Sequence, residues 1–123
     1  MSKLASNYTA AAAIPKHRIV KHGATDREVT LATAATDACI GVSHEISANQ
    51  GERLDVWHVG IVLVEAGAAI ARGAPVASDG TGRGITAAPG AGVNARVIGF
   101  ALEAAGAAGD LVRVLLAPCV MRG

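Results

Sequence analysis

The sequence is poor in bulky side chains. One Trp, one Tyr and one Phe among 123 residues make the chain 2% aromatic, although 51% of it is hydrophobic. Alanine supplies about a fifth of the residues, far above its ordinary usage. A core of small side chains buries little apolar area, and at about 25 cal/mol per Å² an isolated copy gains only marginal stability. We therefore expect one domain with a modest core that associates into a homo-oligomer.

The chain also lacks a charge excess, clustered cysteines and long apolar segments. Eleven Lys and Arg against ten Asp and Glu give a net charge of +1, which supplies no general field for nucleic acid or an anionic membrane. Cys39 and Cys119 fit no metal-ligand or CxxC spacing and are interpreted as small buried residues. No apolar run approaches the roughly 18 residues of a membrane helix, and residues 1–13 do not resemble a signal peptide. We expect synthesis in the cytoplasm and no nucleic-acid or membrane partner.

Glycine is abundant, with 15 residues, and it divides the chain into short Val- and Ile-rich runs. Such runs, bounded by turn residues, are typical of strands, so the alanine content does not predict helices. We predict an all-β fold, a small barrel or sandwich, with short helical turns only at 66–71 and 103–108. Residues 1–13 are expected to be a flexible N-terminal arm and residues 14–123 a single β domain. The expected strands are 17–22, 28–33, 39–45, 53–58, 61–65, 75–78, 84–88, 96–103 and 110–117.

Two further patterns refine this prediction. Strand 110–117 alternates with a period of two, but both of its faces carry apolar residues, which predicts burial on both sides. The Ile-Gly pair at Ile40 recurs at Ile98, and the Gly-acid pair at Gly51 recurs at Gly109, both with an offset of 58 residues. This indicates two similar β units in one pseudo-symmetric fold; the alternative is a chance match within a Gly- and Val-rich chain.

The glycines of the two Ile-Gly pairs, Gly41 and Gly99, are expected to have a structural role. A glycine inside a strand marks a bulge, a sharp bend or the close approach of another backbone. The Gly-acid pairs are interpreted as turns and not as ligand sites.

The sequence offers little for catalysis or metal binding. A metal site of His44, Glu45 and His58 is conceivable if their strands pair, but adjacent strand residues point to opposite faces. No serine stands in a G-x-S-x-G setting, and the small and apolar neighbours of Cys39 suggest burial, not a nucleophile. We predict no catalytic residue, no metal and no cofactor, so the protein is not expected to be an enzyme.

Three features remain as candidate contact sites. Residues 79–84, Asp-Gly-Thr-Gly-Arg-Gly, lack the phosphate-loop pattern and precede a strand, so they are interpreted as a hairpin loop. Trp57 could fill the core or anchor an interface. The third feature is a basic cluster without interleaved aromatic residues, which favours a solvated or protein-facing strand over a nucleic-acid site. The cluster consists of Lys16, His17, Arg18, Lys21 and His22.

Short motifs between residues 14 and 118 also occur in a characteristic order. They are Ile14-Pro15, Arg18-Ile19-Val20-Lys21, Ala38-Cys39-Ile40-Gly41-Val42, Gly51-Glu52-Arg53-Leu54-Asp55-Val56, Gly60-Ile61, Val64-Glu65-Ala66-Gly67, Ile70, Gly73-Ala74-Pro75-Val76-Ala77-Ser78-Asp79-Gly80, Ile98-Gly99-Phe100-Ala101-Leu102-Glu103 and Gly109-Asp110-Leu111-Val112-Arg113-Val114. In this order and spacing, the sequence resembles the small capsid cement, or head decoration, proteins of tailed bacteriophages.

The resemblance implies an all-β structural virion protein that binds the outer surface of the major capsid protein lattice and stabilises the expanded head. It favours a homotrimer, with a homodimer as the alternative. An arm such as residues 1–13 could add a strand to a neighbour's sheet. The alternative function is a small β-barrel binding module or accessory subunit that uses the loop from Asp79 to Gly84. The expected capsid or oligomer contacts are Tyr8, Lys16, Arg18, Lys21, Trp57 and Arg83.

Overall fold

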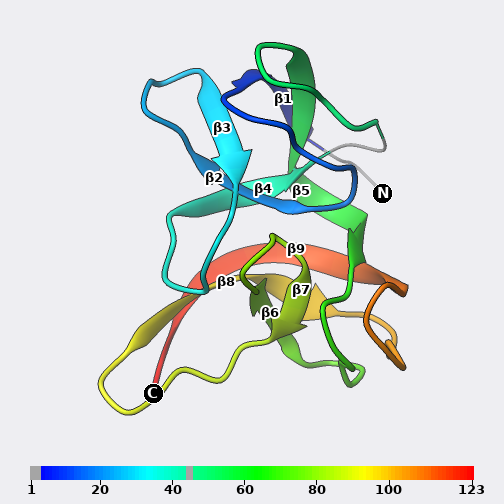
Figure 1. Cartoon of the computed structure of the whole chain (residues 1–123). Helices are drawn as coiled ribbons and strands as arrows, with labels where there is room; N and C mark the ends of the chain where they lie inside the picture. Colours follow the sequence, from blue (N-terminus) through cyan, green and yellow to red (C-terminus); the bar gives the residue numbers. More distant parts are fainter. Residues whose placement is uncertain (1–3, 44–45) are drawn as a thin grey trace.

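The structure is a computed structural model that describes residues 4–43 and 46–123. Within these residues lie nine strands and no helix, and the strands form one continuous sheet, which confirms the all-β prediction (Figure 1). The strands are β1 (Leu4–Ala10), β2 (Ile19–His22), β3 (Glu28–Leu31), β4 (Cys39–Ser43), β5 (Arg53–Glu65), β6 (Pro75–Ser78), β7 (Gly84–Thr86), β8 (Asn94–Ala101) and β9 (Leu111–Arg122).

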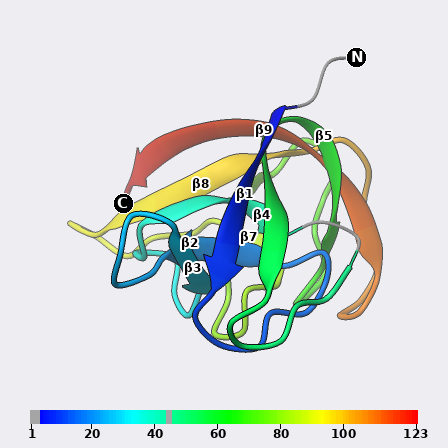
Figure 2. The ribbon, with the colours of Figure 1, turned by 90° about the horizontal axis from the view of Figure 1, so that it is seen from above.

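The first five strands close into a barrel. They are hydrogen-bonded in the order β1-β3-β2-β4-β5, and β5 pairs back onto β1 in antiparallel register, with Thr9 opposite Arg53. Figure 2 shows β1 running alongside β5. We call β1 to β4 with residues 53–59 of β5 unit 1. Because the five strands close on themselves, this part of the sheet has no free edge. The sequence left a barrel and a sandwich as alternatives, and the structure has the barrel.

The other half of the chain repeats this pairing pattern. We call residues 60–65 of β5 together with β6 to β9 unit 2; it lies below unit 1 in Figure 1. The unit 1 pairs β2–β3, β2–β4 and β4–β5 recur as β6–β7, β6–β8 and β8–β9, and β1–β5 recurs as β5–β9. The internal repeat is therefore structural, and the single long strand β5 belongs to both units.

Each unit has its own set of core residues. The cluster in unit 1 includes Val20, Val29 and Val56, which are fully buried. The larger cluster is centred on unit 2, but Ile19 and Val42 of unit 1 also belong to it. The two units are therefore joined by packed side chains as well as by β5.

Both Ile-Gly glycines lie where a neighbouring backbone approaches closely, as the sequence predicts. A Cβ added at Gly41 would overlap the carbonyl oxygen of Trp57, and one at Gly99 would overlap that of Leu115. The two pairs of positions are related by the same offset, so the repeat extends to backbone packing.

The predicted helical turns at 66–71 and 103–108 are wrong. The two segments instead meet each other through an antiparallel bridge, in which Ile70 N donates to Ala105 O at 3.0 Å and Ala105 N donates to Ile70 O at 2.9 Å. Pairing between distant segments satisfies these backbone groups and overrides the helix propensity of alanine.

The expected flexible arm over 1–13 is also wrong for the part that forms β1. Leu4–Ala10 pairs with β5 and, at its end, with β3, and Ala10 is buried. Residues 1–3 lie outside the described residues. The sequence has no clear strand pattern here because most of these residues are small or polar, and pairing with β5 stabilises them as a strand.

Two strand predictions need correction. The runs 53–58 and 61–65 form one strand, β5, because Gly60 continues it at a φ of 114°. Predicted strand 110–117 is not buried on both sides, since Leu111 and Leu115 are exposed while Val112 and Val114 are buried. In the predicted strand 39–45, residues 44–45 lie outside the described residues.

Candidate interaction surfaces

Two of the predicted contact residues, Arg18 and Arg83, belong to an ion-pair network between the units. Arg18 Nη2 lies 3.3 Å from Glu65 Oε2, and Arg83 Nη1 lies 3.7 Å from the same oxygen. Arg18 Nη1 also donates to the carbonyl oxygen of Thr81 at 2.9 Å. Arg18 comes from the segment before β2 and Glu65 from the end of β5, so the network joins unit 1 to unit 2. Both arginines have partners inside the chain.

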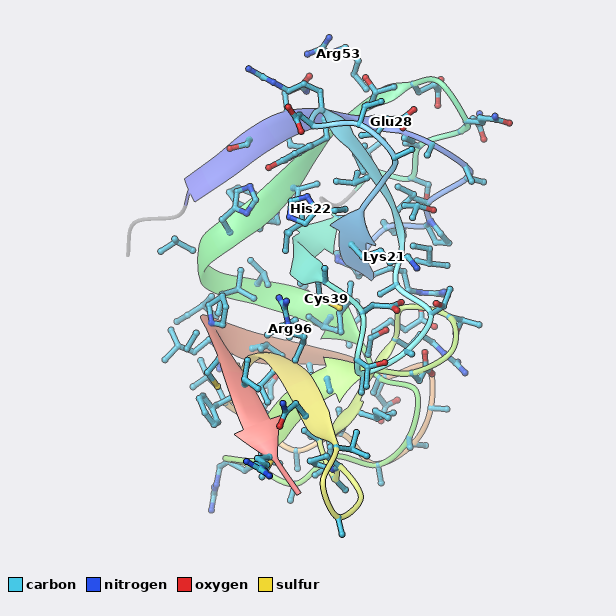
Figure 3. The ribbon with its side chains drawn as sticks, turned by 90° about the vertical axis from the view of Figure 1, so that its left-hand side faces the viewer. Lys21, His22, Glu28, Cys39, Arg53 and Arg96 are labelled. Carbon is cyan, nitrogen blue, oxygen red and sulfur yellow. The ribbon has the colours of Figure 1, made fainter. Side chains whose placement is uncertain are left out.

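The predicted contacts Lys21 and Lys16 differ in their surroundings. Lys21 Nζ lies 3.3 Å from Asp37 Oδ2, whereas Lys16 is exposed, and its backbone N–H donates to Ser47 Oγ at 3.0 Å. Figure 3 shows Lys21 and Cys39 above Arg96, which lies on the neighbouring unit. Burial raises the pKa of Asp37, but hydrogen bonds from Thr33 and the charge of Lys21 outweigh it, so the pKa lies below its usual value. The basic cluster is therefore dispersed, and Lys16 is its most accessible cation.

The two predicted aromatic contacts are both partly buried. The Tyr8 hydroxyl lies 3.2 Å from His58 Nε2, and the two rings meet edge to face with centroids 5.8 Å apart. His58 Nδ1 in turn lies 3.0 Å from the Ile40 carbonyl oxygen. Trp57 packs against the larger core and also lines an open pocket of about 360 Å³ beside Ile61. Tyr8 thus anchors β1 on β5, and Trp57 contributes to the core while keeping one accessible side.

A row of apolar residues on unit 2 was not among the predicted contact residues. Ile61 lies opposite Leu115, Leu115 opposite Phe100, and Phe100 opposite Pro75, so the row crosses β5, β9, β8 and β6. We call these four residues the outer strip. Phe100 is 38% exposed and Leu115 37% exposed. The sequence does indicate this surface, because strand 110–117 has apolar residues on both faces. That pattern predicts burial of both faces inside the chain, whereas one of them lies on the surface.

The loop between β6 and β7 is a hairpin, as predicted. Asp79 Oδ1 accepts hydrogen bonds from the backbone N–H groups of Thr81 at 2.8 Å and Arg83 at 2.9 Å. A phosphate loop would need its N–H groups to point at the ligand. Here the loop's own carboxylate occupies two of them, which weakens the alternative of a ligand-binding module.

The described residues contain no group of three or more His, Cys, Asp or Glu side chains placed to hold a metal ion. Of the three residues considered for such a site, His44 and Glu45 lie outside the described residues, and His58 contacts Tyr8 and Ile40. Burial raises the pKa of the Cys39 thiol to about 11, so it is a poor nucleophile at neutral pH. Across 4–43 and 46–123, no helix has the length and apolar character needed to cross a membrane.

The fold defines a small all-β protein of two fused units. Over residues 2–116, the sequence matches the phage cement protein family. The chain belongs to that family, and this confirms the resemblance inferred from its motifs. It is accordingly a structural protein of a phage virion.

A solved structure shares the fold. The head fibre gp8.5 N base of bacteriophage phi29 superposes with a TM-score of 0.72 at 18% identity, covering 94% of this chain and 95% of that one. No curated protein sequence matches the chain.

Proposed function

We propose that this protein cements the phage head by binding the outer surface of the expanded major capsid lattice, where it bridges neighbouring capsid subunits. Membership of the phage cement family over nearly the whole chain carries the proposal. A rigid β scaffold suits this role, because cementing requires contact surfaces and no reacting group. Many weakly bound copies on one lattice stabilise it collectively, since each added bridge acts at high effective concentration.

The end of unit 1 offers the surface that we assign to the capsid. Ile46 is 73% exposed, the most exposed of the large hydrophobic side chains in the described residues. The segment that carries Ile46 runs alongside the segment that carries Lys16, because Ile14 bridges Ala48 and Lys16 N donates to Ser47 Oγ. An exposed apolar side chain next to an exposed cation suits an acidic protein surface with an apolar recess.

The other predicted contacts take supporting roles in this proposal. Arg18 joins unit 1 to unit 2 through Glu65, and Arg83 binds the same carboxylate from within unit 2. Tyr8 fixes β1 on β5 through His58. Lys21 is paired with Asp37 and orders the loop before β4. The proposed assembly is a homotrimer on the lattice, with a homodimer as the alternative.

The test is to mix the purified protein with expanded capsids that lack it, and to measure co-sedimentation. We expect stoichiometric, saturable binding and heads that resist disruption better than undecorated ones. The variants I46D and K16E should bind at least about tenfold more weakly, since a charge at the contact costs one to several kcal/mol. The matched control is R72E, which changes an exposed cation on unit 2 and should bind normally. Failure of the unmodified protein to bind any expanded capsid would contradict the proposal.

A further inference from the structure

The outer strip has a counterpart inside the chain. In unit 1, Ile19 on β2 lies opposite Val42 on β4, and Val42 lies opposite Trp57 on β5. In unit 2, strands β6, β8 and β9 correspond to β2, β4 and β5 of unit 1. Pro75 on β6 lies opposite Phe100 on β8, and Phe100 lies opposite Leu115 on β9. The two rows are therefore equivalent surfaces of two units with the same fold.

The two rows differ in what covers them. Ile19 and Val42 are both 0% exposed, because they pack into the core cluster of unit 2, and Trp57 packs against the same cluster. Phe100 and Leu115 remain more than one third exposed, and neither belongs to a core cluster of the described residues. In unit 1, this row is thus buried by a second unit of the same fold, and in unit 2 it lacks that cover.

Apolar surface extends beyond the outer strip along β9. Val120 and Met121 are exposed and, together with Pro75 and Phe100, line a hollow of about 220 Å³. Beside the strip, Arg113 is paired with Glu103 at 3.5 Å. The exposed Arg96 lies opposite Val120, at the edge of this surface. An apolar surface with a polar rim is typical of a protein–protein interface.

We propose that a second copy of this chain covers the outer strip, and that the strips of neighbouring copies pack against each other around a symmetry axis. The equivalent row of unit 1, which includes Ile19 and Val42, is already buried in this way by unit 2, a unit of the same fold. Packing of the outer strip against unit 1 of another copy is disfavoured, because the core of unit 1 offers no open apolar surface. Its residues Val20, Val29 and Val56 are already fully buried. A closed, self-complementary contact is also the common form of homo-oligomer. The proposal concerns the protein alone, and its failure leaves capsid binding a separate question.

The test is sedimentation of the full chain, without capsids, across a range of concentrations. We expect a dimer or a trimer for the unmodified protein. The variants F100E and L115E should each weaken association at least about 100-fold, because a carboxylate would be buried in an apolar contact. The control is I46E, which places the same charge at an exposed apolar position on unit 1 and should leave association unchanged. Circular dichroism should show that all variants keep the strand content of the parent.

A photo-crosslinking side chain at position 100 identifies the occupant directly, even if a charged variant fails to fold. Cross-links to β8 or β9 of another copy support the proposal. A protein that stays monomeric at all concentrations overturns it, as does an oligomer that F100E and L115E leave intact. Cross-links to unit 1 of another copy, or to the major capsid protein alone when capsids are added, also overturn it.

Discussion

Gly99 on β8 lies directly against the backbone carbonyl of Leu115 on β9, at the point where the register of these two strands shifts. Gly41 on β4 has the same relation to Trp57 on β5. Each glycine lets two strands approach more closely than any other residue would allow. The same local solution at the same position in both units is the clearest mark of the internal repeat.

The first prediction concerns these glycines. We expect G99A and G41A each to lower the free energy of unfolding by about 2 kcal/mol or more, because the new methyl group meets a backbone oxygen that cannot rotate away. Urea denaturation followed by circular dichroism measures the loss. The control is G90A, where a Cβ has no atom within 4 Å, and it should change stability by less than about 0.5 kcal/mol. Equal effects at positions 90 and 99 would contradict this explanation.

The second prediction concerns the ion pairs between the units. E65Q removes the carboxylate shared by Arg18 and Arg83, and because these side chains are largely buried we expect a loss of about 1–2 kcal/mol in thermal or urea unfolding. E103Q is the matched control. It breaks the pair with Arg113, whose side chain is 60% exposed, and should cost less than about 0.5 kcal/mol. A neutral E65Q would show that the network does not hold the units together.

The third prediction concerns the two thiols. At pH 8 only about a thousandth of Cys39 is thiolate, given a pKa of about 11, and the side chain is half-buried. Cys119 is exposed. At a dilution where the protein is monomeric, we expect iodoacetamide to modify Cys119 rapidly and Cys39 slowly, as followed by mass spectrometry. C119S should lose the rapid phase and C39S should retain it. Equal rates at the two positions would refute the burial of Cys39.

The fourth prediction concerns the loop before β4. Asp37 Oδ2 accepts hydrogen bonds from Thr33 N and Thr33 Oγ1, both at 2.8 Å, and from Ala34 N at 3.1 Å. Its pKa in the folded protein lies below the ordinary value of 3.8, so the unfolded chain binds the proton more readily. The stabilisation is complete above pH 3.8 and is lost as the pH falls through the lower pKa of the folded state.

The variant D37N tests this directly. It should melt a few degrees below the unmodified protein at pH 7, and the difference should shrink when both are compared at progressively lower pH. A difference in melting temperature that stays constant down to pH 2 would mean that the carboxylate charge has no part in ordering the loop.

The all-β class and the repeat could be predicted from the sequence because their signals are local. Glycine spacing and Val- and Ile-rich runs report turns and strands within a few residues, and the offset between Ile40 and Ile98 reports duplication directly. The helical turns failed for a physical reason. Alanine favours helix in isolation, whereas Ile70 and Ala105 find backbone partners in each other, thirty-five positions apart.

The predicted contact residues show the same limit. Arg18 and Lys21 are charged in the sequence, but only the fold shows that Glu65 and Asp37 lie within ion-pair distance of them. The outer strip could not be predicted from the sequence. The alternation along strand 110–117 shows that both faces are apolar, but it does not show which face packs against the chain's own core. Val112 faces that core and Leu115 does not.

The sequence alone thus determined a small-residue, two-unit β protein of the phage cement family, since composition, turn spacing and motif order are properties of the linear chain. The tertiary structure decided that the expected arm closes a barrel, that β5 serves both units, and that one apolar face of unit 2 is left uncovered. These features depend on which distant segments meet, and strand pairing between distant segments leaves only a weak trace in local sequence.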